Sequence, residues 1–243
     1  MNFLQQLFFS LKFRINRFFH EKLLFKFLSK EKLFTSIYLN NYWGSSESLS
    51  GPGSSLDSTV EIRTNLPILF DKFNIKSVFD APCGDMNWMR YISYKHPLKY
   101  IGGDIVREIV NTNASKFSSI NISFVLFDIT TNNFPAADVW LCRHCLFHLS
   151  NLDIFHALEQ FASSDIKYIL TTSHVTDADH VNRDIVTGDW RLLNLRMPPF
   201  NFPINAEWEV LDYIDPHPAA TLTLWKREQI LELMPALRLI YQQ

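Results

Sequence analysis

Short apolar runs alternate with amphipathic stretches from about residue 76 to residue 174. The runs are rich in β-branched and aromatic residues, and each has the length of one strand. We expect strands at Ser77–Asp80, Tyr100–Ile105, Ile122–Ile129, Ala137–Arg143 and Lys167–His174. The stretches between them have helical spacing, which predicts helices at Asn87–Tyr94, Val106–Lys116 and Leu152–Ala162. This alternation predicts right-handed βαβ units and a sheet covered on both faces.

The alternation stops after residue 174. Residues 175 to about 220 are rich in proline and have little periodicity, which predicts an irregular insertion on the substrate side of the sheet. Thr221–Trp225 and Arg238–Tyr241 are expected to supply two more strands, with a helix at Lys226–Leu237 between them. The predicted fold is therefore α/β, with a doubly wound, mostly parallel seven-stranded sheet.

The first 40 residues have the pattern of a basic amphipathic helix. Phe and Leu recur at three- and four-residue spacing, and lysine and arginine outnumber the acids. Charges interrupt each apolar run before the roughly 18 residues that a membrane span needs, and no signal-peptide cleavage site follows. Residues 1–35 are expected either to bind an anionic membrane surface or, as we favour, to pack on the main domain with a solvated basic face.

A Ser/Gly-rich segment follows at residues 43–55. Its turn formers predict an irregular loop, for which a simple linker is one interpretation. Tyr42 and Trp43 at its start are large for a spacer, so we expect the loop to fold over a ligand. A helix is predicted next, at Thr59–Phe70.

Composition narrows the class of protein. The chain has 243 residues, with 47% hydrophobic residues, 20% charged residues and a net charge of -2, as in a soluble globular protein. These values exclude disordered, collagen-like and disulfide-scaffold proteins. Three cysteines indicate a reducing compartment, and we expect the cytoplasm. A pI of about 6.4 provides no general attraction for nucleic acid, so no such partner is predicted.

Polar residues close the predicted strands. In open α/β sheets ligands bind outside the carboxyl ends of the strands, so these positions are candidate site residues. The second strand closes with Asp104, an acid placed to accept hydrogen bonds from both ribose hydroxyls of a nucleoside. The first closes with the turn Asp80–Asp85, the third with Asp128 and the fourth with Cys142-Arg143-His144.

The first turn discriminates between nucleoside cofactors. A dinucleotide requires the glycine-rich pattern G-x-G-x-x-G, because its pyrophosphate lies against bare backbone. This turn has Gly84 alone, between Asp80 and Asp85. Carboxylates repel a pyrophosphate but attract an ammonium group. S-adenosylmethionine carries an ammonium and a sulfonium and no phosphate, so it is the expected cofactor. A nicotinamide-dependent sugar reductase or epimerase is the alternative, which the missing glycines disfavour.

These residues resemble the motifs of the class I S-adenosylmethionine-dependent methyltransferases over roughly residues 60–174. Asp80-Ala81-Pro82-Cys83-Gly84-Asp85 resembles the first motif, with Pro82 and Cys83 where glycine is more usual. Asp104 matches the ribose-binding acid, Phe127-Asp128-Ile129 the adenine-side motif, and Cys142 to Leu149 the fourth motif. Residues 43–55 and 82–89 together resemble a bacterial subgroup found beside polysaccharide genes.

The resemblance implies a cofactor site and divides the chain into two parts. Residues 1–58 are expected to form the N-terminal helical extension and the lid loop, and residues 59–243 the methyltransferase domain. Trp43 is expected to cover the cofactor and Arg63 to hold its carboxylate, unless Arg63 is a surface charge on its helix. The other implied cofactor-binding residues are Asp80, Pro82, Cys83, Gly84, Asp85, Asp104, Ile105, Asp128, Cys142 and Arg143.

Methyl transfer is an in-line displacement that also removes a proton from many acceptors. His148 and His144 are candidate bases, expected four residues apart on one helix face, unless they are partly buried residues bonded to the backbone. The polar and aromatic residues between 182 and 203 favour a small polar or saccharide-like acceptor. Cys142-x-x-Cys145 lacks the second ligand pair of a structural zinc site, so no metal is predicted. A non-catalytic module that binds the cofactor remains a second alternative.

The predicted location follows from these features. The protein is expected in the cytoplasm, with residues 1–35 as its contact to the inner face of the membrane if they bind lipid. The acceptor atom and the oligomeric state have no signature in the sequence.

Overall fold

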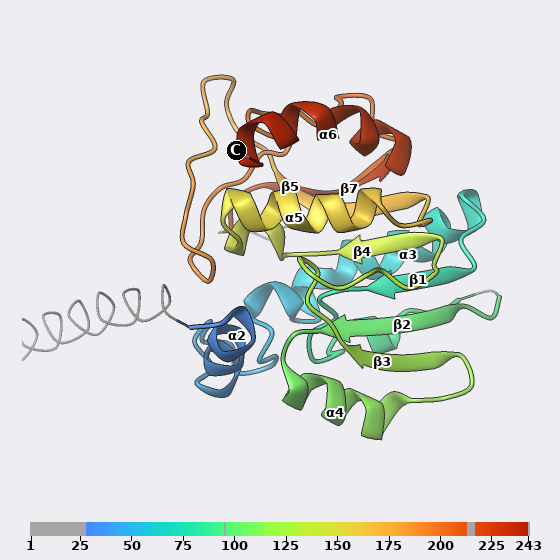
Figure 1. Ribbon diagram of the computed structural model, residues 1–243. Coiled ribbons are helices and arrows are strands. Elements are labelled where there is room, and N and C mark those ends of the chain that lie inside the picture. The colour runs from blue at the N-terminus through green and yellow to red at the C-terminus, as the bar shows by residue number, and fades with distance from the viewer. Residues whose placement is uncertain (1–27, 95, 213–216, 243) are drawn as a thin grey trace, which may run out of the picture.

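The computed structural model describes residues 28–94, 96–212 and 217–242 (Figure 1). A seven-stranded sheet in the order β3-β2-β1-β4-β5-β7-β6 forms its centre. Strands β1 to β5 run parallel, and β7 is antiparallel to both β5 and β6. The predicted α/β, doubly wound class is confirmed, and the sheet is mixed at one edge. The strands are β1 (Ser77–Asp80), β2 (Lys99–Asp104), β3 (Ile122–Leu126), β4 (Val139–Cys142), β5 (Tyr168–His174), β6 (Trp208–Leu211) and β7 (Ala220–Lys226).

Helices cover both faces of this sheet, because successive side chains of the buried strands point to opposite sides. Phe79 and Trp140 pack with α5 (Asn151–Ala162) and α6 (Arg227–Tyr241). Val78 and Leu141, each one residue away along the same strands, pack with α3 (Val60–Lys72). Helix α4 (Arg107–Phe117) contacts β2 and β3. The sheet therefore has two apolar cores, and its polar groups concentrate at the strand ends.

Two predicted elements at the carboxyl-terminal end are wrong. Arg238–Tyr241 is not a strand but the last turn of α6, whose buried Leu237 continues the apolar face of the helix. The missing strand is β6, inside the region predicted to be irregular. It is an edge strand that pairs with β7 alone and has alternating half-buried and exposed positions. Such a strand has a weak apolar pattern, which explains why the sequence does not reveal it.

Two further elements are shorter than predicted. Asn87–Tyr94 contains turns and one 3₁₀ segment, Met89–Tyr91, in place of a helix. The third strand ends at Leu126, which pairs with the last residue of β2, Asp104. The Phe127 amide makes one more backbone hydrogen bond, to Asp104 O at 2.9 Å, and the chain leaves the sheet after it.

Helix α2 (Lys30–Leu39) lies beside the carboxyl ends of the parallel strands (Figure 1). Ser29 caps it by accepting a hydrogen bond from the Lys32 amide, and Leu33 and Ile37 are buried. Gly188 lies directly against Leu33, since a Cβ at Gly188 would come within 2.8 Å of its Cδ2 atom. Residues 1–27 lie outside the described residues, so membrane contact through 1–35 stays a prediction. No helix in the described ranges is long and apolar enough to cross a bilayer.

Candidate functional site

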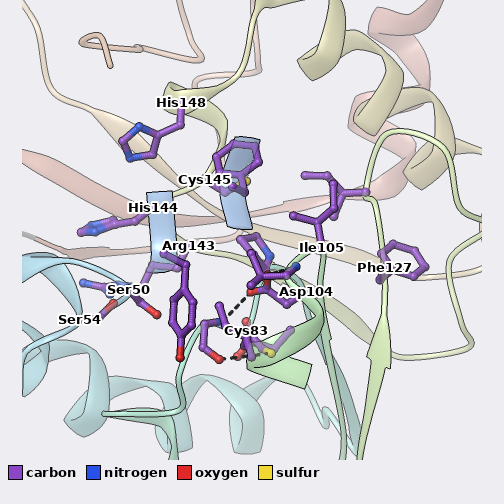
Figure 2. A pocket seen from close by; sticks show the side chains of 18 of the residues that line it. Ser50, Ser54, Cys83, Asp104, Ile105, Phe127, Arg143, His144, Cys145 and His148 are labelled. Carbon is purple, nitrogen blue, oxygen red and sulfur yellow. Dashed lines mark hydrogen bonds between the residues drawn. The ribbon is translucent and has the colours of Figure 1, made fainter. Parts of the chain in front are cut away.

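A cavity opens at the carboxyl ends of β1, β2 and β4, and α2 and the loop after it form one wall. Figure 2 shows His144 and His148 at one end of it and Cys83 and Asp104 at the other. Most of the predicted site residues line this cavity: Trp43, Asp80, Pro82, Cys83, Gly84, Asp104, Ile105, Asp128, Arg143, His144 and His148.

Three predicted cofactor-binding residues do not line the cavity: Arg63, Asp85 and Cys142. The Arg63 guanidinium donates to Leu56 O at 2.7 Å and to Thr59 Oγ1 at 3.2 Å, so it braces the start of α3. The Asp85 carboxylate accepts hydrogen bonds from the Ser48 hydroxyl and the Leu49 amide, which anchor residues 48–49. Cys142 is completely buried in β4.

The first turn is joined to the end of β2. Gly84 has φ +56°, and its amide donates to Asp104 Oδ2 at 3.1 Å. The Val106 amide donates to the other Asp104 oxygen at 2.9 Å. A Cβ at Gly84 would meet Ser50 Oγ at 2.5 Å, so both the left-handed backbone and the close loop require glycine. Burial raises the pKa of Asp104 to about 6 despite these two amide donors.

Asp80 is a second buried carboxyl group on the cavity wall. Tyr100 donates its hydroxyl proton to Asp80 Oδ2 at 2.7 Å. Burial nevertheless raises the pKa of Asp80 to about 7, and the nearby Asp104 charge acts in the same direction. A cation in the cavity would stabilise the ionised forms of both acids.

Helix α2 contributes cavity residues that sequence reasoning missed: Lys30, Phe34 and Tyr38. The Lys30 ammonium donates to Asp153 Oδ1 at 2.9 Å and lies 3.7 Å from Asp128 Oδ2. It also contacts the Thr130 hydroxyl. Lysine 30 thereby joins α2 to α5 and to the predicted adenine-side acid. No local motif marks these residues, because only the tertiary fold brings α2 to the strand ends.

His144 and His148 both line the cavity, but the prediction that they share a helix face is wrong. His144 has φ +51°, which breaks any helix, and the 3₁₀ segment begins two residues later at Leu146. The His148 ring lies 5.4 Å from the Trp43 ring, and its Nδ1 atom is 2.9 Å from Asp189 O. Burial lowers the pKa of His148 to about 4, so the ring is neutral at pH 7.

A second cavity adjoins the first. Five residues line both: Trp43, Ser50, Arg143, His144 and His148. Its other walls include Phe147, His174, Trp190 and Asp212. Arg143 and Asp212 form a buried ion pair with an Nη2–Oδ1 distance of 2.7 Å, and Asp212 Oδ2 lies 3.3 Å from His144 Nε2.

Sequence reasoning missed His174, although it closes a predicted strand and the strand-end rule could have found it. Asp212 was missed because it follows β6, the strand that the pattern did not reveal. Among the polar and aromatic residues between 182 and 203 that favoured a polar acceptor, Trp190 lines this cavity. Arg191 is buried instead, and it donates to Leu149 O at 2.7 Å. Arg191 therefore holds the insertion against the start of α5.

Cys142 and Cys145 are both buried free thiols. Within the described ranges, no group of three or more His, Cys, Asp or Glu side chains is arranged to hold a metal ion.

No family model and no curated protein matches this sequence. Solved structures do match. The human N-acetylserotonin methyltransferase in complex with SAM aligns over 82% of this chain and 60% of its own, with a TM-score of 0.54 and 17% identity. The fold is that of the class I methyltransferases. The chain spans about 60% of the length of that human enzyme.

Two bacterial methyltransferases support the same fold. The magnesium protoporphyrin IX methyltransferase of Synechocystis PCC 6803, solved with SAH, covers 81% of this chain and 97% of its own, with a TM-score of 0.57 and 10% identity. The 1,6-didemethyltoxoflavin-N1-methyltransferase of Burkholderia thailandensis covers 81% and 86%, with a TM-score of 0.54 and 14% identity. These structures do not confirm the resemblance to a polysaccharide-associated subgroup, which stays a hypothesis.

The class I methyltransferase fold places both cavities at the edge where ligands bind in open α/β sheets. The first cavity contains the turn and the strand-end acids, and the second lies on the side of His174 and β7. The shared residues form a junction between them, across which two ligands would meet.

Proposed function

We propose that this protein transfers a methyl group from S-adenosylmethionine to a small polar acceptor. The observation that carries the proposal is the pair of buried carboxyl groups, Asp80 and Asp104, that face one cavity beside the Gly84 turn. A ligand with an ammonium and a sulfonium offsets this negative charge, whereas a phosphate adds to it.

The cavity residues fit the parts of S-adenosylmethionine. Asp104 would accept hydrogen bonds from the ribose hydroxyls, and Asp80 with the Gly84 turn would lie at the methionine end. Ile105 and Asp128 would contact the adenine, and Arg143 would lie under the sulfonium. When bound, the cofactor supplies a methyl carbon activated by the sulfonium, so the protein's part is to position the acceptor and receive its proton.

The alternatives fit the site less well. In a nicotinamide-dependent enzyme the pyrophosphate would face Asp80 and Asp104, two carboxyl groups with no arginine or lysine bonded to them in the described structure. A module that binds the cofactor without catalysis does not explain the second cavity, which adjoins the first through His144 and His148. That adjacency supports an enzyme with an acceptor site.

Binding of S-adenosylmethionine to the wild type and to Asp104→Ala tests the proposal by calorimetry. The substitution is expected to weaken binding by at least about 1.5 kcal/mol, the lower range for a hydrogen bond to a charged group. Affinity in the wild type is also expected to fall as the pH drops below 6, because protonated Asp104 is a poorer acceptor. That pH dependence should be weaker in Asp104→Asn.

The matched control is Asp165→Ala, an exposed acid just before β5, at the opposite end of that strand from the cavity. It is expected to bind like the wild type. Heat with NAD and none with S-adenosylmethionine would overturn the proposal in favour of the nicotinamide alternative.

A further inference from the structure

The second cavity is lined by rings and by few charges. Its rings include Trp43, Phe147 and Trp190, with Phe147 6.5 Å from Trp190 between ring centroids. Among the described residues that line it, Arg143 and Asp212 alone carry a fixed charge, and they neutralise each other as a pair with side chains 4% and 0% exposed. These walls favour an uncharged ring over an ion.

The backbone fixes which nitrogen of His148 carries the proton. Its Nδ1 atom lies 2.9 Å from Asp189 O, and a carbonyl oxygen only accepts, so Nδ1 carries the hydrogen. The ring is neutral at pH 7, since burial lowers the pKa of His148 to about 4. Its Nε2 atom is therefore a lone-pair acceptor, on a ring that lines both cavities.

His174 has the opposite tautomer. Its Nδ1 atom accepts the Leu193 amide hydrogen bond at 3.1 Å, so a neutral ring carries its proton on Nε2. Burial lowers the pKa of His174 to about 4 as well. Both imidazoles flank Phe147, whose ring centroid is 4.5 Å from His148 and 5.0 Å from His174. The cavity thus has one fixed donor and one fixed acceptor around the same aromatic ring.

His144 is less suited to receive a proton. Its Nε2 atom lies 3.3 Å from Asp212 Oδ2, so a neutral ring donates there. Its Nδ1 atom lies against Gly53, where there is no room for even a Cβ atom. Of the two histidines at the junction, His148 therefore has the accessible lone pair.

We propose that the second cavity binds an uncharged ring that carries hydroxyl groups, and that the methylated atom is a hydroxyl oxygen whose proton passes to His148 Nε2. This inference rests on the proposed methyltransferase function. A hydroxyl group satisfies both histidines, because it donates its hydrogen to His148 Nε2 and accepts a hydrogen bond from His174 Nε2 on its oxygen. One hydroxyl can make both bonds, or two hydroxyls of one ring can make one each. An ammonium would face the His174 donor, and a carboxylate would face the His148 lone pair.

The reaction balances with these groups alone. The hydroxyl oxygen bonds to the methyl carbon while the carbon–sulfur bond breaks. The electron pair of the carbon–sulfur bond stays with sulfur, which becomes the uncharged thioether of S-adenosylhomocysteine. The hydroxyl proton moves to His148 Nε2 and then to solvent. Saccharides and phenols both present uncharged rings with hydroxyl groups, so the experiment includes one of each.

Binding of four probes to protein saturated with S-adenosylhomocysteine tests the inference, measured at pH 7 by ligand-observed NMR. The probes are methyl glucoside, phenol, benzoate and benzylammonium. At least one neutral ring is expected to bind about tenfold more tightly than either ion, and His174→Phe and His148→Phe should each remove most of that preference. His156→Phe, a control on α5 that lines neither cavity, should retain it.

Other results would contradict either the inference or the proposed function. Equal or tighter binding of benzoate or benzylammonium, or binding of neither neutral ring, overturns the inference but leaves the proposed cofactor in place. Failure to bind S-adenosylhomocysteine at all contradicts the proposed function itself. Long-range ¹H–¹⁵N spectra at pH 7 test the tautomers directly, with the two Phe variants assigning the signals. Identical protonation patterns for His148 and His174 would also overturn the inference.

Discussion

Asp212→Ala is expected to lower the free energy of unfolding by about 3–5 kcal/mol, because it leaves the Arg143 guanidinium charged and unpaired inside the protein. Both Asp212 oxygens accept from Arg143 Nε at 3.0 Å, and Oδ1 accepts from Nη2 at 2.7 Å. In the variant, water does not readily replace the hydrogen bonds that Arg143 loses, because both side chains are almost fully buried in the wild type. Urea unfolding of the two proteins measures the difference.

An exposed ion pair gives the control. Glu207 lies 3.0 Å from the Lys226 ammonium, with side chains 26% and 46% exposed. Glu207→Ala is expected to change stability by no more than about 1 kcal/mol. The double variant Arg143→Met with Asp212→Leu should recover most of the loss, because it leaves no buried charge. If Asp212→Ala is no more destabilising than Glu207→Ala, the pair is not the buried contact described here.

The same pair has a signature at acid pH. Although burial opposes ionisation, Arg143 and His144 lower the pKa of Asp212 to about 2 from 3.8. The stabilisation from this depressed pKa is present above 3.8 and is lost as the pH falls toward 2. The free energy of unfolding of Asp212→Asn should therefore depend less on pH in that window than the wild type's does.

The sequence predicts the buried centre of this fold better than its edges. Strands β1, β4 and β5 lie inside the sheet, and each contains consecutive buried apolar residues: Val78-Phe79, Val139–Cys142 and Ile169-Leu170. The edge strand β6 alternates instead, and Glu209 interrupts its apolar residues. Arg238–Tyr241 contains the apolar residues of a strand, but the helix that buries Leu237 extends through it.

The sequence likewise predicts some residues of the candidate site and misses others. Asp80 and Asp104 end their strands and Gly84 lies in the turn after β1, so the rule that ligands bind at strand ends locates them. Lys30 and Asp212 reach the cavities only through α2 and β6, whose positions no sequence pattern specifies. Arg63 and Asp85 have the right chemistry for a cofactor site, but near neighbours in the chain or the loop already satisfy them.

Asp80→Asn is expected to stabilise the ligand-free protein at pH 8 by as much as about 4 kcal/mol. The pKa of the Asp80 carboxyl in the folded protein, about 7, lies above the ordinary 3.8 because the group is buried. Its favourable contribution is complete below pH 3.8 and is lost as the pH rises through 7. An amide has no charge to bury, and its oxygen can still accept the Tyr100 hydroxyl hydrogen bond.

The same substitution is expected to weaken S-adenosylmethionine binding at least about tenfold, because a cation near Asp80 interacts with a carboxylate far more strongly than with an amide. Thermal unfolding from pH 5 to pH 8 and calorimetry measure the two effects. Asp138→Asn is the control, since that acid accepts the Lys76 and Ser77 amides and has a lowered pKa, so its loss should destabilise. A stability gain in Asp80→Asn that does not grow from pH 5 to pH 8 contradicts the buried charge. Near pH 7 the wild type should also release protons on binding the cofactor, because a cation draws Asp80 into its ionised form, and the variant should release fewer.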